Sequence, residues 1–80
     1  MSKGGNMPCI INAANEIAVA AFLSDTLGFM EIPELIESCM ENIKFINNCT
    51  FDDYMETDKE TRHYANTLLA AKKSVISPER

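Results

Sequence analysis

Length, composition and charge exclude several classes of protein before any motif is considered. Eighty residues make one domain at most, and a hydrophobic content of 46% is normal for a globular chain and too high for a disordered one. Twelve acidic against seven basic residues give a net charge of −5, which argues against nucleic acid and anionic membranes as partners because both need a basic patch.

The first predicted element is a helix from Pro8 to about Ser24, preceded by a flexible lead-in over residues 1–7. Proline suits the first turn of a helix, and the alanines that follow favour helix strongly. Apolar residues at three- and four-residue spacing cover most sides of this segment: Ile10, Ile11, Ala14, Ile17, Ala18, Val19, Ala21, Phe22 and Leu23. We therefore predict a central helix that is buried on most sides and ends before Gly28, a C-terminal glycine.

The second predicted helix runs from residue 32 to 44. Pro33 fits its first turn, and three glutamates place negative charge near its positive N-terminal end. The amphipathic pattern is carried by Ile32, Leu35, Ile36, Cys39, Met40 and Ile43. Asn47 and Asn48 then indicate a loop.

The pattern Ser/Thr-x-x-acid occurs twice in the second half of the chain, beginning at Thr50 and at Thr57. In this pattern the threonine oxygen accepts an N–H of the first helical turn and the acid bonds back to the threonine N–H. The first copy predicts a short helix over 51–56, and the second predicts a longer helix over 58–74. The inward side chains of the longer helix are expected to be Tyr64, Ala65, Leu68, Leu69 and Val75.

The sequence therefore predicts an all-α fold, a small helical bundle of three main helices plus one short helix. No segment alternates apolar and polar residues as a strand does, and no internal repeat is present. The helical domain is expected to span residues 8–76, and residues 77–80 are expected to form a frayed tail.

Nothing in the sequence assembles into a catalytic, cofactor-binding or metal-binding set. Cys9, Cys39, Cys49 and His63 lack the short spacings of a zinc site, and no glycine-rich phosphate loop or nucleophile elbow is present. The odd number of cysteines, two of them among apolar residues, indicates free thiols acting as small hydrophobes in a reducing compartment. Because no signal peptide is visible either, we expect a cytoplasmic protein.

The polar group Asn12, Asn15 and Glu16 is unusual because it interrupts an otherwise apolar helix. One interpretation is catalytic, with Glu16 as acid, base or metal ligand and the two amides as donors. The structural interpretation is favoured: one of the amides bonds the backbone of segment 45–50, because a buried amide must be satisfied. Glu16 would then pair with a lysine or bond backbone N–H groups.

Residues 4–23, Gly-Gly-Asn-Met-Pro-Cys-Ile-Ile-Asn-Ala-Ala-Asn-Glu-Ile-Ala-Val-Ala-Ala-Phe-Leu, resemble the C-terminal region of the 1-deoxy-D-xylulose 5-phosphate reductoisomerases. That family has a Gly-Gly-x-x-Pro lead, then Asn-Ala-Ala-Asn-Glu and an alanine-rich helix ending in Phe-Leu. The resemblance continues more weakly through Gly28-Phe29-x-Glu31-Ile32, Phe51-Asp52-Asp53 and Thr57-Asp58 to about residue 71. The chain departs from the family at Pro33, Phe51 and Tyr54.

The resemblance implies a parent enzyme that uses NADPH and a divalent metal, Mg or Mn, to form 2-C-methyl-D-erythritol 4-phosphate in non-mevalonate isoprenoid biosynthesis. It implies three domains, of which this chain matches only the C-terminal helical one. The metal-binding carboxylates and phosphate-binding serines belong to the middle domain, and none of them maps onto this sequence.

The expected role is therefore structural: packing on the parent's catalytic domain through the wide apolar face of the first helix. The isolated chain is expected to have no enzyme activity and to form a homodimer or a swapped helix arrangement at high concentration. The alternative is a stand-alone all-α module that binds a partner protein.

Overall fold

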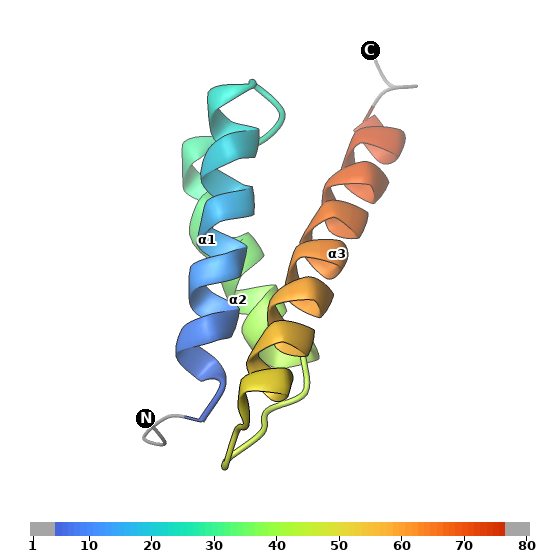
Figure 1. Cartoon of the computed structure of the whole chain (residues 1–80). Helices are drawn as coiled ribbons and strands as arrows, with labels where there is room; N and C mark the ends of the chain where they lie inside the picture. The colour runs from blue at the N-terminus through green and yellow to red at the C-terminus, as the bar shows by residue number, and fades with distance from the viewer. Residues whose placement is uncertain (1–4, 77–80) are drawn as a thin grey trace.

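The computed structural model describes residues 5–76, with side chains as far as residue 71, as three α-helices and one short 3₁₀ helix (Figure 1). In chain order these are α1 (Met7–Leu23), η1 (Phe29–Glu31), α2 (Ile32–Asn42) and α3 (Phe51–Ile76). This part of the chain contains no strand, so the predicted all-α class is confirmed. None of the helices described is long and apolar enough to span a membrane. Residues 1–4 of the predicted lead-in and the predicted tail, 77–80, lie outside the described residues.

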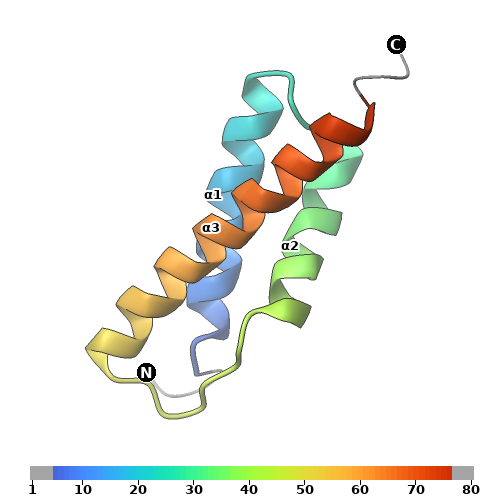
Figure 2. The same ribbon diagram turned by 90° about the vertical axis from the view of Figure 1, so that its right-hand side faces the viewer.

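Helix α1 is the central element, because α2 and α3 both pack mainly against it and touch each other less. Figure 1 shows α1 and α3 close together at the N-terminal end of α3 and diverging towards its C-terminal end. The view turned by 90° shows α3 running diagonally across the bundle (Figure 2). Leu68 and Leu69 of α3 line a small cavity together with Leu35 of α2.

The core consists mainly of small side chains. Its buried members are Ile10, Ala14, Ala18, Ala21, Leu27, Leu35, Cys39, Ile43 and Ala65. The alanines bring the α1 backbone close to its neighbours, and larger residues of α2 and α3 close the edges of the core. All six apolar positions predicted for the second helix belong to the core or pack against it, and Tyr64, Ala65, Leu68 and Leu69 face inward as expected. The side chain of Val75 lies outside the described residues.

Helix α1 ends at Leu23, five residues before the glycine that was expected to end it. The left-handed residue that turns the chain is Asp25, with φ of 62°, while Gly28 has an ordinary φ of −79°. Aspartate tolerates this conformation because its short polar side chain can bond locally. Gly28 instead caps η1, and its N–H donates to Glu31 Oε1 at 2.8 Å.

The two helices predicted after residue 50 are a single helix, α3, of 26 residues. Its start was predicted correctly: Asp53 N–H donates to Thr50 Oγ1 at 3.2 Å, and Thr50 N–H donates to Asp53 Oδ2 at 3.0 Å. The second capping pattern was wrong, because Thr57 lies inside the helix and its buried hydroxyl accepts a hydrogen bond from Asn6. The only short helical element among the described residues is therefore η1.

Residues 5–7 form an ordered part of the fold and not a loose lead-in. Met7 begins α1, and the buried pair Gly5 and Asn6 lies against the segment that links α2 to α3. Asn6 Nδ2 donates to the Lys44 carbonyl and to Thr57 Oγ1, both at 2.9 Å, while Asn6 Oδ1 accepts from Ile46 N–H at 2.9 Å. We refer to Gly5 and Asn6 with these partners as the N-terminal clasp. It joins the start of α1 to α3 and to the α2–α3 loop.

Candidate functional site

The side of α1 that faces away from α2 and α3 is exposed and largely apolar. We define the outward face of α1 as the exposed side chains of Ile11, Asn12, Asn15, Val19, Phe22 and Leu23. These residues are three or four apart, so they share one side of the helix. Leu23 is 75% exposed although it is strongly apolar. The prediction that this helix is buried on most sides is therefore only half right within this chain.

The outward face continues into η1. Phe22 packs edge-to-face against Phe29, with ring centroids 5.9 Å apart. Phe29 and its neighbour Met30 are 68% and 76% exposed. Large apolar side chains that adjoin one another at the surface form the kind of patch that usually contacts another protein.

Asn12 and Asn15 are on the outward face and are both exposed, so the prediction that one of them bonds segment 45–50 is wrong. The predicted segment does receive a side-chain amide, but that amide belongs to Asn6. Sequence reasoning missed Asn6 because it precedes the first helix next to two glycines. It stands at the N-cap position of a helix that begins with proline, yet its side chain makes no capping bond, so the neighbouring residues did not signal its distant partners.

Helix α1 carries one charged residue, Glu16, at the edge of this face. Arg62 of α3 donates from Nη2 to Glu16 Oε1 at 2.6 Å and from Nε to Asp58 Oδ2 at 3.0 Å. The hydrogen bonds to Glu16 and then to Asp58 raise the pKa of Arg62 above its ordinary value. The predicted partner of Glu16 was a lysine or backbone N–H, and the observed partner is an arginine.

Replacing Glu16 by glutamine should lower the free energy of unfolding by no more than about 1 kcal/mol, because exposed ion pairs contribute little in water. The side chains of Glu16 and Arg62 are 53% and 36% exposed. The loss should shrink further in high salt, which screens exposed charges. Urea unfolding of Glu16→Gln beside Glu37→Gln, an exposed glutamate on α2, measures the difference. A loss that is large and independent of salt would contradict this prediction.

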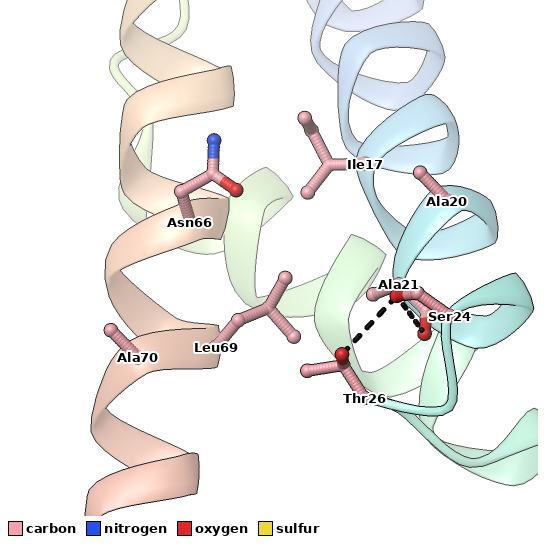
Figure 3. A pocket seen from close by; sticks show the side chains of 8 residues that line it. All are labelled: Ile17, Ala20, Ala21, Ser24, Thr26, Asn66, Leu69 and Ala70. Carbon is pink, nitrogen blue, oxygen red and sulfur yellow. Dashed lines mark hydrogen bonds between the residues drawn. The ribbon is translucent and has the colours of Figure 1, made fainter.

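A groove of about 380 Å³ lies where α1 and α3 diverge (Figure 3). Its lining comes from both helices and from the turn after α1: Ile17, Ala20, Ala21, Ser24, Thr26, Asn66, Leu69 and Ala70. The Ser24 hydroxyl donates to the Ala21 carbonyl at 3.2 Å, and the Thr26 N–H donates to the same carbonyl at 2.8 Å. The groove contains no charged side chain and no group suited to acid–base chemistry.

The cysteines and the histidine do not form a reactive centre among the described residues. Cys39 is buried in the core, Cys9 Sγ lies 3.5 Å from the Tyr54 carbonyl, and Cys49 Sγ lies 3.1 Å from the Ile46 carbonyl. Burial raises the pKa of each thiol, which disfavours the thiolate that a nucleophile or metal ligand needs. His63 is exposed. Within this part of the chain no three His, Cys, Asp or Glu side chains come together as a metal site.

Comparison with known proteins gives one consistent family. The model of the DXP reductoisomerase C-terminal domain matches residues 1–64. The chain is 49% identical over 69 residues to the 1-deoxy-D-xylulose 5-phosphate reductoisomerase of Bacteroides fragilis, which is 86% of this chain and 18% of that relative. The Bacteroides thetaiotaomicron enzyme gives the same values, and the Listeria innocua enzyme is 47% identical over 66 residues, 82% of this chain and 17% of that relative. No solved structure matches significantly.

Proposed function

This chain belongs to the family of DXP reductoisomerase C-terminal domains, and from that membership we propose that it is the structural C-terminal domain of such an enzyme, packed on the catalytic domain. The chain spans about 18% of the length of the curated relatives it matches. The rest of the parent supplies the chemistry in this proposal: NADPH as hydride donor and a divalent metal, Mg or Mn. The free thiols of Cys9, Cys39 and Cys49 fit a reducing compartment such as the cytoplasm.

The observation that carries the proposal is the outward face of α1. A helix that faces only water normally carries charged side chains there, as α2 does with the exposed Glu34, Glu37 and Glu41. Helix α1 instead presents Ile11, Val19 and other apolar groups. At about 25 cal/mol per Å² of apolar area, covering these side chains with a second domain gives a substantial driving force for docking.

The described residues do not fit a metal or a nicotinamide cofactor. They contain no cluster of three ligating side chains, and the apolar groove between α1 and α3 offers no basic group for a phosphate. We therefore assign no residue of this chain to NADPH or to the metal, and its role is to support the domain that binds them.

The proposal predicts that this chain can replace the matching 69-residue segment of the Bacteroides fragilis enzyme. We expect the chimera to convert 1-deoxy-D-xylulose 5-phosphate with NADPH and magnesium, and the 80-residue chain alone to give no turnover. Val19→Glu in the chimera should reduce turnover by about tenfold or more, because an unpaired carboxylate buried at an interface costs several kcal/mol.

The matched control is Thr67→Glu, which places the same charge on the exposed side of α3. A folded but inactive chimera would argue for the stand-alone interaction module. Equal turnover in the Val19 and Thr67 variants would remove the outward face from the docking surface. Turnover by the isolated chain would contradict the structural role.

We also expect the isolated chain to self-associate through the outward face of α1, because Val19, Phe22 and Leu23 remain exposed there. Association must overcome the loss of translational freedom and the repulsion of two chains of charge −5. The homodimer should therefore be weak and should strengthen with added salt. Sedimentation equilibrium near millimolar concentration measures it, and Val19→Glu should restore the monomer. A monomer at all salt concentrations would contradict this expectation.

A further inference from the structure

Two side-chain amides lie in the middle of the outward face of α1. Asn12 and Asn15 are exposed, and the apolar side chains of Ile11 and Val19 lie just before and just after them on the same side. Asparagine is a poor residue for the middle of a helix because its side chain competes for backbone partners. On a helix surface that faces only water, glutamate or lysine would favour the helix more than asparagine does. The pair is therefore explained by a contact outside this chain.

The amide group identifies the chemistry of that contact. Each amide offers two N–H donors and one carbonyl acceptor, which complement the C=O and N–H of a peptide group. Because the amide is uncharged, it can be buried in an apolar interface if its hydrogen bonds are made. The N-terminal clasp gives the same pairing inside this fold, since Asn6 bonds both the Ile46 N–H and the Lys44 carbonyl.

The spacing of the two amides favours an extended partner segment. Side chains three residues apart on a helix have Cβ atoms about 5–6 Å apart. Peptide groups that face the same side of an extended chain recur every two residues, roughly 6.6 Å apart. A partner helix cannot hydrogen-bond the amides through its backbone, because the backbone N–H and C=O groups of a helix already bond one another. A second copy of α1 is a helix too, so it cannot bond the two amides through its backbone. Self-association would therefore cover the apolar side chains but leave the hydrogen bonds of the amides unmade.

We propose, resting on the function proposed above, that the outward face of α1 binds an extended backbone segment from the remainder of the parent enzyme. Asn12 and Asn15 bond the peptide N–H and C=O groups of that segment, while Ile11, Val19 and Phe22 pack against its side chains. The segment comes from the parent because the aligned region is only 18% of the length of the matched relatives, which leaves most of each enzyme to supply it. The partner segment is uncharged where it crosses the outward face, because this face has no charged side chain that could pair with a charge on the segment.

The test uses the chimera with the Bacteroides fragilis enzyme and the double substitution Asn12→Leu with Asn15→Leu. Leucine keeps a similar size and favours the helix, so the bundle itself stays folded. We expect amide hydrogen exchange to become at least about tenfold faster at a few backbone N–H groups outside the transplanted chain, because each lost bond is worth about that factor. Asn66→Leu, an exposed mid-helix asparagine on α3, is the matched control and should change no such group.

The outcomes separate this inference from the proposed function. If the double variant changes no amide outside the transplanted chain while Val19→Glu still releases the domain, docking stands and the backbone contact is refuted. If the backbone N–H groups with faster exchange lie in a helix of the parent enzyme, the inference that the partner segment is extended is refuted. If neither variant alters exchange or turnover, the outward face is not the docking surface: the backbone contact is refuted, and the proposed packing on the catalytic domain loses the surface on which it rests.

Discussion

Gly5→Ala is expected to lower the free energy of unfolding by about 2 to 5 kcal/mol, because it combines left-handed strain with a collision between backbones. Gly5 has φ of 49°, and a Cβ built on it would lie 2.1 Å from the Ile46 carbonyl oxygen. That oxygen cannot simply move aside, since it accepts the Asn6 N–H at 3.0 Å and the Cys49 thiol at 3.1 Å. A domain of this size has a total stability of only about 4 to 12 kcal/mol. The substitution therefore removes a large part of the stability of the fold.

Gly28→Ala is the matched control for Gly5→Ala. A Cβ at Gly28 would meet only the flexible side chain of Glu31, with Oε1 nearest at 3.3 Å, and the φ of Gly28 is ordinary. The change in stability should stay within about 1 kcal/mol. Urea unfolding followed by circular dichroism compares the two variants. If both glycines tolerate alanine equally, the close approach at the N-terminal clasp is not rigid.

Asn6→Ala should be the most damaging change of a polar side chain, lowering the free energy of unfolding by about 3 to 5 kcal/mol as its hydrogen bonds are lost and their partners are left buried. The Asn6 side chain is fully buried and holds the Lys44 carbonyl, the Ile46 N–H and the Thr57 hydroxyl, each at 2.9 Å. Because these groups belong to the loop and to α3, the variant loosens the connection of both to α1.

The comparison for Asn6→Ala is Asn15→Ala in the isolated chain. Asn15 is exposed on α1, so its removal should change stability by about 0.5 kcal/mol or less, with a slight gain from the better helix former. Thermal unfolding of both variants gives the contrast directly. Equal losses of stability in the two variants would mean that the hydrogen bonds of the Asn6 side chain contribute nothing to the stability of the fold.

The local signals in the sequence predicted the helices well because those signals act over a few residues. Pro8 and Pro33 mark the first turns of α1 and α2, and Thr50 with Asp53 marks the start of α3. The same local pattern at Thr57 failed because a capping sequence inside a continuing helix costs little. Thr57 instead lies within α3, and its hydroxyl accepts a hydrogen bond from the Asn6 side chain.

The candidate surface was only partly predictable. The sequence established that α1 is apolar on most sides, but it could not tell which apolar residues the rest of the bundle covers. The fold buries Ile10 and four of the five alanines of α1 and leaves Ile11, Val19 and Leu23 exposed. Helices α2 and α3 pack on the alanine-rich side of α1 because small side chains let them approach the α1 backbone closely. This packing depends on the shapes of both partner helices at once.

The sequence by itself determined the all-α class, the starts of α1, α2 and α3, and the family, although it also predicted a further helix start at residue 58 that does not exist. The starts that it located depend on residues near one another in the chain. Only the tertiary structure decided which asparagine is buried. Asn6 is held by partners 38 to 51 residues away, whereas Asn12 and Asn15 are exposed on the far side of α1. Burial of a polar group is set by the free energy of bonds between distant segments, and the residues next to it in the sequence carry no information about those segments.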